Sequence, residues 1–321
     1  MKKALIFGIN GQDGSFLSEI LLEKGYEVHG LIRRTAKDNL QNIKHIINDL
    51  KLHYGDLCDP ISIQKAINIA KPIEIYNEAD QDHAGISFEI PSYNFDVTGS
   101  AVGRILEIIK NFNKNIKYFQ PATSNMFGLT KVCPQNEQTP FYPLSPYACA
   151  KVFAYYACRM YRKNYKMFVS TAIFYNHESE RRTINYVTRK ITKTAVRISL
   201  GLEKELILGD LNAKIDWGYA KEYMNAAWNI MQQTKPDDYV IGTGIQTSVK
   251  EFVKKTFEYL KLDYKKFVKT SKKFLRPAKN LPLVADSSKA KIRFGFKPKI
   301  GVDKLIKIMV DHDITQEKNW K

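Results

Sequence analysis

The chain has 321 residues, enough for one large domain or two closely packed ones, and its 44% hydrophobic and 26% charged residues are ordinary for a globular protein. No apolar run approaches the roughly 20 residues of a membrane-spanning helix, so we expect no membrane segment. The net charge of +17 comes mostly from lysines spread along the chain without a basic block, so we expect no nucleic-acid partner.

The first eight residues combine a basic start with a short apolar run that leads straight into glycines. This run is too short for a signal peptide and predicts a buried first β-strand, so we expect a cytoplasmic protein. The four cysteines, Cys58, Cys133, Cys149 and Cys158, show no metal-ligand spacing, which favours free thiols in a reducing compartment. We expect Cys149 to pack inward as a small residue.

Strand and helix signals alternate over the first half of the chain. Short apolar runs predict strands at residues 3–8, 27–32, 52–54, 74–77 and 116–121. Helical periodicity predicts helices at residues 16–24, 43–50, 61–70 and 97–110, with Gly25 ending the first of them. This alternation predicts an α/β fold with a doubly wound parallel sheet.

The turn after the first predicted strand carries glycines at positions 8, 11 and 14. Glycine allows a tight turn and lets the backbone approach a pyrophosphate, and the following helix N-terminus adds N–H donors and a favourable dipole. The spacing is G-x-x-G-x-x-G, and its place between strand and helix predicts a dinucleotide site. The residues expected to bind the cofactor here are Gly8, Asn10, Gly11, Gln12, Asp13 and Gly14.

The second predicted strand ends at Arg33 and Arg34. NAD enzymes usually place an acidic residue here for the ribose 2′-hydroxyl, whereas arginines suit a 2′-phosphate. The chemistry therefore favours NADP, and NAD stays open because the arginines can also be a solvated pair. Further cofactor contacts are expected at the ends of the third and fourth strands, from Asp56, Leu57, Asn77 and Ala79.

After about Phe174 the alternation loosens. Residues 176–182 form a polar, charged segment that we predict as a loop, and Pro277 and Pro282 interrupt a later one. We predict a dinucleotide-binding Rossmann domain at residues 1–175 and a smaller lobe for the substrate at residues 176–321, with some later segments returning to the first domain.

Tyr147 and Lys151 are four residues apart and share one face if this segment is helical. An ammonium beside a phenol favours the phenolate, which makes tyrosine a usable base near neutral pH. Alone, this spacing is a weak signal. Here it follows the glycine-rich turn and a strand that leads into Thr123, Ser124 and Asn125, and together these parts predict a sugar-oxidising dehydrogenase.

Over nearly its whole length the chain resembles the extended short-chain dehydrogenases and, among them, the GDP-mannose 4,6-dehydratases. The segments that carry the resemblance are residues 8–14, 77–83, 140–143, 145–148, 176–179, 187–191 and 216–218. The resemblance implies a Rossmann fold, a GDP-sugar substrate, a nicotinamide cofactor and a homo-oligomer, either a dimer or a tetramer. A dimer would form through the helices flanking Tyr147, with Phe153, Tyr155 and Tyr156 as the apolar face.

The resemblance also implies the oxidation chemistry. Tyr147 would take the proton of the hexose C4 hydroxyl while hydride leaves C4 for the nicotinamide. Lys151 would hold the nicotinamide ribose and lower the tyrosine pKa, and Thr123 would hydrogen-bond the same hydroxyl. The family then uses a glutamate two positions after the threonine to carry the C5 proton to the leaving C6 hydroxyl, and this chain has Asn125 there.

A carboxamide such as that of Asn125 does not ionise near pH 7 and cannot act as a general base. Positioned acid–base catalysis is worth roughly 10²–10⁴-fold in rate, so we expect C4 oxidation without loss of water. Glu78, Asp80 and Asp82 leave an alternative open, because one of these acids can stand in for the missing glutamate. Asp80 and Asp82 replace small residues of the family.

The resemblance places Asn176 near the substrate diphosphate, Val187 and Lys190 near the guanine, and Arg276 on a phosphate. Asp82 and Ser124 are further expected substrate contacts. The family has an arginine where this chain has Ile215, and Lys214, Arg181 or Arg182 can compensate. The acids near the sugar favour GDP-D-glycero-D-manno-heptose over GDP-mannose.

A pure oxidase keeps the hydride on its cofactor. It must exchange the reduced cofactor or pass the hydride to a second ketone such as a 2-oxo acid, and we expect the cofactor to be retained tightly. Two other functions stay open: an active 4,6-dehydratase with a relocated carboxylate, and a silent nucleotide-sugar-binding regulatory subunit. The presence of Thr123, Tyr147 and Lys151 argues against the second.

Overall fold

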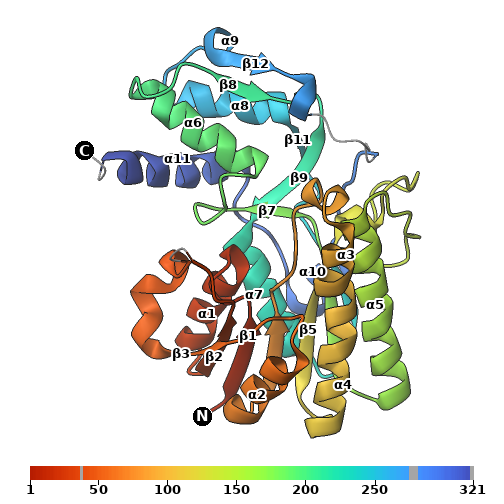
Figure 1. Cartoon of the computed structure of the whole chain (residues 1–321). Coiled ribbons are helices and arrows are strands. Elements are labelled where there is room, and N and C mark those ends of the chain that lie inside the picture. The colour runs from red at the N-terminus through yellow and green to blue at the C-terminus, as the bar shows by residue number, and fades with distance from the viewer. Residues whose placement is uncertain (37–38, 275–280, 319–321) are drawn as a thin grey trace.

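The computed structural model describes residues 1–36, 39–274 and 281–318. Its larger part is a seven-stranded sheet with the order β10-β6-β5-β4-β1-β2-β3, in which all neighbours pair in parallel (Figure 1). The strands are β1 (Lys3–Phe7), β2 (Glu27–Ile32), β3 (Leu50–Tyr54), β4 (Glu74–Asn77), β5 (Lys117–Thr123), β6 (Val169–Phe174) and β10 (Asp238–Ile241). The prediction of a doubly wound α/β fold is confirmed.

Helices cover both faces of this sheet. The helical segments are α1 (Gln12–Glu23), η1 (Gln41–Asp49), α2 (Pro60–Ala70), η2 (Ile86–Phe88), α3 (Pro91–Asn94), η3 (Phe95–Ser100), α4 (Ala101–Asn113), η4 (Ser124–Met126), α5 (Pro146–Tyr165), α7 (Ala220–Met231) and α10 (Ser288–Phe294). In β1 the alternate residues Ala4 and Ile6 pack with α1 and α7, and Leu5 and Phe7 pack with α2 and α4. Burial on both sides explains why the strand reads as a continuous apolar run.

A smaller part contains two short sheets, β11-β9-β7 and β12-β8. Its elements are β7 (Asn176–Glu178), α6 (Val187–Ser199), β8 (Leu206–Leu208), β9 (Lys214–Tyr219), β11 (Gln246–Ser248), α8 (Val249–Tyr259), α9 (Tyr264–Phe267), β12 (Val268–Thr270), η5 (Lys272–Phe274) and α11 (Val302–Lys318). Trp217, Phe252 and Met309 belong to its apolar core. Between these elements the chain returns to the large sheet, where α7 packs on α1 and β10 forms an edge.

Two local predictions differ in part from the structure. The helix predicted at residues 43–50 is present as η1, a 3₁₀ helix that ends at Asp49 because Leu50 already belongs to β3. Residues 176–182 are not entirely loop, because the first three form β7, which pairs in parallel with β9. The polar side chains of β7 hid this strand from a search for apolar runs.

The outer face of α5 also differs from expectation. Cys149 is exposed rather than packed inward, because Tyr147, Ala148 and Lys151 occupy the buried side of the helix. Of the expected apolar face, Tyr155 is buried in the core, whereas Phe153 and Tyr156 are each 55% exposed. The pairing of two copies through this helix stays a prediction. Among the described residues, no helix is long and apolar enough to cross a bilayer.

Candidate functional site

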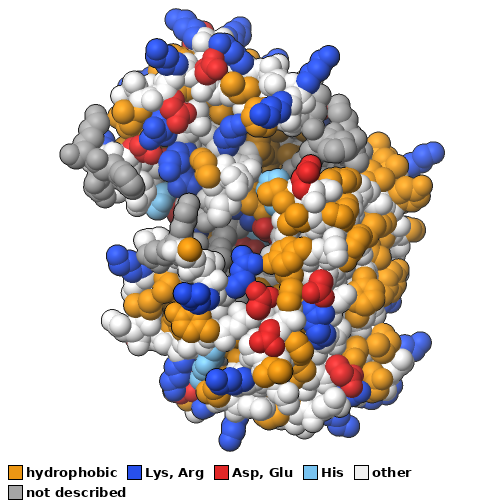
Figure 2. Space-filling view, in the orientation of Figure 1, with side chains coloured by type: hydrophobic (Ala, Val, Ile, Leu, Met, Phe, Trp, Pro, Cys, Tyr) orange, Lys and Arg blue, Asp and Glu red, His pale blue; other side chains and the backbone are white. Residues whose placement is uncertain are grey.

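A cleft of about 2210 Å³ opens between the large sheet and the smaller part (Figure 2). Its walls come from the glycine-rich turn, the carboxyl ends of β2 to β5, the first turns of α5, and the segments around β7, α6 and β9. Open parallel sheets bind ligands outside the carboxyl ends of their strands, so this is the natural place for a site.

The glycine-rich turn is closed so tightly that side chains are excluded. Gly8 has φ +75°, and a Cβ built on it would lie 2.8 Å from the carbonyl oxygen of Glu78. A Cβ on Gly14 would collide with the carbonyl oxygen of Gly8, so Gly14 brings α1 close to the turn and does not itself line the cleft. The first turn of α1 follows directly and faces the cleft through Gln12 and Asp13, an arrangement that fits a dinucleotide pyrophosphate.

Asp13 joins this turn to the smaller part of the protein. Its carboxylate lies 2.9 Å from Nε2 of His177, and Nδ1 of the same ring lies 2.8 Å from the carbonyl oxygen of Tyr175. Burial opposes both charges, but the pairing prevails: it raises the pKa of His177 and lowers the pKa of Asp13. Because both partners of the ring can only accept, His177 satisfies them fully as the imidazolium.

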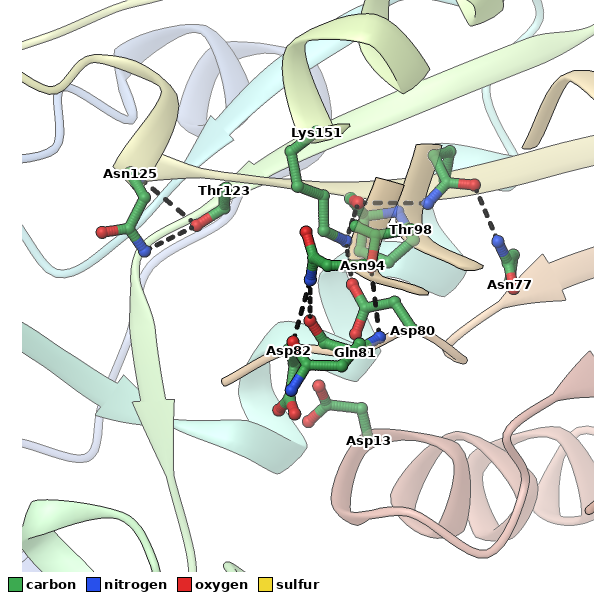
Figure 3. A network of polar contacts seen from close by, with 12 residues as sticks. Asp13, Asn77, Asp80, Gln81, Asp82, Asn94, Thr98, Thr123, Asn125 and Lys151 are labelled. Atoms are coloured by element: carbon green, nitrogen blue, oxygen red, sulfur yellow. Dashed lines mark hydrogen bonds and ion pairs between the residues drawn. The ribbon is translucent and has the colours of Figure 1, made fainter. Parts of the chain in front are cut away.

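Tyr147 and Lys151 lie on the buried face of α5, as their spacing predicted. The helix begins after Ser145, whose hydroxyl accepts a hydrogen bond from the Ala148 N–H. The Lys151 ammonium donates to the Pro121 carbonyl oxygen at 2.9 Å. It also lies 2.5 Å from a carboxylate oxygen of Asp80 (Figure 3).

This ion pair changes the electrostatics expected at Tyr147. Burial raises the pKa of Tyr147, Lys151 opposes that rise, and Asp80 and Asp82 add to it. Lys151 thus lowers the pKa of Tyr147 as expected, while burial and the nearby carboxylates act in the opposite direction and leave it above its ordinary value. The pKa of Lys151 is itself raised, since its carboxylate neighbours overcome the cost of burying the ammonium.

Thr123 and Asn125 form a second polar unit at the end of β5. The Thr123 hydroxyl oxygen accepts hydrogen bonds from the backbone N–H of Asn125 at 3.3 Å and from its side-chain amide at 3.2 Å (Figure 3). Both residues line the cleft. The carboxamide therefore stands directly beside the threonine that was expected to hold the substrate hydroxyl.

The three acids after β4 have different environments. Asp80 pairs with Lys151, and Asp82 lies 3.5 Å from the guanidinium of Arg182. Glu78 has one carboxyl oxygen without a hydrogen-bond partner among the described residues, and burial raises its pKa well above the ordinary range. Asp80 and Asp82 are thus both paired with cations, and neither acid is bonded to Thr123 or Asn125 among the described contacts.

Comparisons with known proteins agree with this architecture. A model of the GDP-mannose 4,6 dehydratase family matches residues 5–309. GDP-mannose 4,6 dehydratase 1 of Arabidopsis thaliana is 47% identical over 332 residues, covering 100% of this chain and 92% of that protein. The chain belongs to the GDP-mannose 4,6-dehydratase family.

Solved structures resemble this family member in fold. A dTDP-glucose 4,6-dehydratase of Bacillus anthracis in complex with NAD has a TM-score of 0.86 at 21% identity, covering 99% of this chain and 98% of its own. The protein RMD of Pseudomonas aeruginosa complexed with NADPH has a TM-score of 0.83 at 16% identity, covering 98% of this chain and 100% of its own. At such identities the likeness shows the fold alone.

Most cofactor residues expected from the sequence lie in the cleft. They are Gly8, Asn10, Gly11, Gln12, Asp13, Arg33, Asp56, Leu57, Ala79, Tyr147 and Lys151. Arg33 is exposed and donates a hydrogen bond to the Tyr93 hydroxyl at 2.7 Å, whereas Arg34 is exposed and does not line the cleft. Asn77 is buried in the sheet instead, where its amide donates to the Gln120 side chain at 2.9 Å.

The expected substrate residues Asp82, Ser124, Asn176, Val187 and Lys190 also line the cleft. Arg276 and Pro277 lie outside the described residues.

Several of the cations in and beside this cleft already have partners. The Lys190 ammonium donates to the Ile207 carbonyl oxygen at 2.8 Å. Arg182 lies 3.6 Å from the centroid of the Tyr186 ring, and Arg181 pairs with Glu19 of α1.

Sequence analysis assigned no role to His177, named Arg182 only as a cation that can compensate for Ile215, and did not pair Asp80 with Lys151. His177 lies 164 positions from its partner Asp13, and Arg182 lies 100 positions from Asp82. Lys151 and Asp80 are 71 positions apart. No spacing rule connects residues so far apart. The one available signal was the concentration of charge in residues 176–182, beside the unusual acids after β4.

Proposed function

We propose that this chain binds NAD(P) and a GDP-sugar and oxidises the sugar C4 hydroxyl to a ketone without removing water. The observation that carries this proposal is the Thr123–Asn125 unit, in which a carboxamide stands where the resemblance calls for a carboxylate. The glycine-rich turn supports the cofactor, because its two excluded Cβ positions leave room for a close approach. NADP is favoured over NAD by the exposed guanidinium of Arg33 at the edge of the cleft.

The bound nicotinamide supplies the acceptor for the hydride that leaves C4. Tyr147 takes the proton of the C4 hydroxyl on its phenolic oxygen, and the Thr123 hydroxyl binds the same substrate oxygen. Lys151 holds its ammonium beside the cleft through Pro121 and Asp80. Tyr147 and Lys151 are only 7% and 3% exposed, so bulk water competes little for these groups.

Elimination of water needs a second group that removes the C5 proton and protonates the C6 oxygen. The amide of Asn125 cannot do this, because it has no titratable proton near neutral pH. Asp80 and Asp82 are engaged by Lys151 and Arg182, which argues against either acid as the replacement. Burial raises the pKa of Glu78, the third acid, and this proposal gives Glu78 no part in the proton transfer, so the proposed reaction stops at the 4-keto sugar.

The substrate is a GDP-sugar, with GDP-D-glycero-D-manno-heptose favoured over GDP-mannose. Asn176, Val187 and Lys190 bind the nucleotide part in this proposal, and all three line the cleft. The extra carbon of a heptose offers another hydroxyl, and Asp82, whose side chain is half exposed in the cleft wall, can accept a hydrogen bond from it. The hydride then leaves on exchanged cofactor or passes to a second ketone such as a 2-oxo acid.

Mass spectrometry of the product tests this function. The purified protein is incubated with each GDP-sugar, and we expect the product to have lost two hydrogens rather than one water. Asn125→Glu should restore loss of water, because it returns a titratable group to this position, whereas the matched variant Asn125→Gln should not. A 6-deoxy product formed efficiently by the unaltered chain would refute the proposal.

The second candidate is a 4,6-dehydratase, and it is favoured by the names of the relatives. In that case Asn125→Glu would change the rate but not the product. The third candidate is a regulatory subunit without catalysis. Turnover by the unaltered chain that is lost when Tyr147 is changed would exclude it. Absorbance at 340 nm of the protein as purified tests the expected retention of reduced cofactor.

A further inference from the structure

We propose that Glu78 meets the bound dinucleotide as a neutral carboxylic acid and donates a hydrogen bond to its pyrophosphate. The inference rests on the proposed function only for the presence of a nicotinamide dinucleotide in the cleft. It gives Glu78 a part in binding the cofactor, whereas the proton of the sugar hydroxyl is still taken by Tyr147.

The backbone of Glu78 is fixed directly against the glycine-rich turn. Its N–H donates to the carbonyl oxygen of Phe7, the last residue of β1, at 2.9 Å. Its own carbonyl oxygen would lie only 2.8 Å from a Cβ built on Gly8, so no side chain separates the two segments. Both Gly8 and Glu78 line the cleft. A pyrophosphate held by this turn therefore lies beside the segment that carries Glu78.

The carboxyl group of Glu78 has an unused hydrogen-bonding atom. Its Oε1 is shielded from solvent and has no hydrogen-bond partner among the described residues. A buried polar atom without a partner costs free energy, and native structures leave few of them. In the wall of a ligand cleft, such an atom points to the bound molecule as its partner, so Glu78 fits a dinucleotide in this place.

The surrounding charges decide which form of this carboxyl group meets the cofactor. Each neighbouring acid has a cation of its own, because Asp13 is paired with His177 and Asp80 with Lys151. Burial and the carboxylates of Asp13 and Asp80 raise the pKa of Glu78 well above its ordinary value, and Lys151 opposes them only in part. The titratable groups that act on Glu78, or on which it acts, are Asp13 of α1, Asp80 of its own loop, Lys151 of α5, Tyr76 of β4 and Tyr118 of β5.

The neutral form suits an anionic ligand for two reasons. A carboxylic acid has one O–H donor, whereas a carboxylate can only accept hydrogen bonds, as pyrophosphate oxygens do. The hydrogen bond from a neutral Glu78 to a pyrophosphate oxygen is therefore charge-assisted. An ionised Glu78 would instead place like charges side by side in a site with little water to screen them.

Infrared spectroscopy of the complex with NADPH tests the protonation state without any sugar present. The cofactor retained on purification is removed, and NADPH is added to the unaltered chain and to Glu78→Gln. At pH 7, the difference between the two spectra should contain the C=O band of a protonated carboxylic acid, which is separate from the bands of a carboxylate. A difference spectrum with carboxylate bands alone would overturn the inference.

Titration calorimetry with NADPH tests the hydrogen bond. Glu78→Gln should bind NADPH within about threefold of the unaltered chain because an amide also donates, whereas Glu78→Leu should bind about tenfold or more weakly. Glu203→Gln is the matched control and should leave the affinity unchanged, because Glu203 lines the smaller part of the cleft and is paired with Arg197.

Thermal unfolding shows whether the variants fold, and Glu78→Met, which keeps the length of the side chain without a donor, replaces Glu78→Leu if that variant does not. Equal affinities of the Gln variant and the variant without a donor would overturn the inference. Failure of the unaltered chain to bind NADPH would overturn it together with the cofactor of the proposed function. A product that has lost water would refute the proposed function alone and leave these binding results standing.

Discussion

Two ion pairs that are largely shielded from solvent join distant segments around the cleft. Lys151 meets Asp80, and Asp13 meets His177. A buried charge without a partner costs several kcal/mol, whereas a pair with good geometry offsets most of that cost. Glu78 has no cationic partner at bonding distance among the described residues. Burial therefore raises its pKa, and the neutral acid is favoured over the carboxylate.

Tyr147 offers the first test at the level of one residue. Tyr147→Phe removes the proton acceptor but keeps the ring, so C4 oxidation should fall by roughly 10²–10⁴-fold while affinity for the GDP-sugar changes little. Initial rates measured at 340 nm and titration calorimetry separate the two effects. Tyr142→Phe is a suitable control, since Tyr142 is 60% exposed, and it should retain full activity. Oxidation at a normal rate by Tyr147→Phe would remove this residue from the mechanism.

At the scale of elements, the site depends on the contact between the first turn of α1 and β7. Asp13 and His177 form the charged part of this contact, and the Gln12 side chain adds hydrogen bonds with the His177 carbonyl oxygen and the Ser179 hydroxyl. The three bonds bind the glycine-rich turn to the smaller part of the protein. A change in either element therefore reaches both the expected cofactor region and the expected substrate region.

The Asp13–His177 pair predicts a specific pH dependence of stability. The raised pKa of His177 gives stability that is present below its unfolded value, near 6.5, and is lost as the pH rises through the folded pKa. The lowered pKa of Asp13 gives stability that is present above about 3.8 and is lost as the pH falls. Asp13→Asn should therefore lower the free energy of unfolding by about 1–3 kcal/mol at pH values between 3.8 and the folded pKa of His177. At higher pH the loss should be smaller.

Thermal unfolding of this variant and the unaltered chain from pH 4 to 9 measures the difference. His45→Gln is a useful comparison, because His45 also faces a carboxylate but is half exposed, and it should have little effect at any pH. An Asp13→Asn deficit that stays constant across this range would show that the pair carries no such charge.

Prediction from sequence succeeded for strands and turns whose structure depends on one residue type, apolar in the buried strands and glycine in the turn. The apolar runs of β1, β2 and β4 gave strands whose bounds match within one residue, and the glycine triplet gave the turn. It failed for β7, a strand of polar residues whose partners lie far away in the chain. The Asp80–Lys151 pair was missed for the same reason, since composition cannot show which of several acids reaches a given lysine.

At the scale of the whole molecule, the two parts are not successive halves of the chain. The polypeptide leaves the large sheet after β6, builds β7 to β9, and returns with α7 and β10 before it leaves again. In the core under α1, Leu17 and Leu21 belong to the same apolar cluster as Met224 and Ala227 of α7. The larger core is therefore complete only when both stretches of sequence are present.

A fragment of residues 1–175 tests this arrangement. It lacks α7 and β10, so the apolar face of α1 is uncovered and β6 becomes an unprotected edge. We expect the fragment to lack a cooperative thermal transition followed by circular dichroism, and co-expression with residues 176–321 to restore one. A sharp transition in the fragment alone would show that the first 175 residues fold independently.

The outward direction of Cys149 offers a practical means of observing this protein. The thiol sits on the exposed side of α5, one helical turn from Phe153, while Tyr147 and Lys151 of the same helix line the cleft. With Cys58 and Cys133 replaced by serine, a maleimide dye would attach selectively at this point. Its rate of attachment at increasing protein concentration would then report whether a second copy shields the helix, independently of any enzymatic assay.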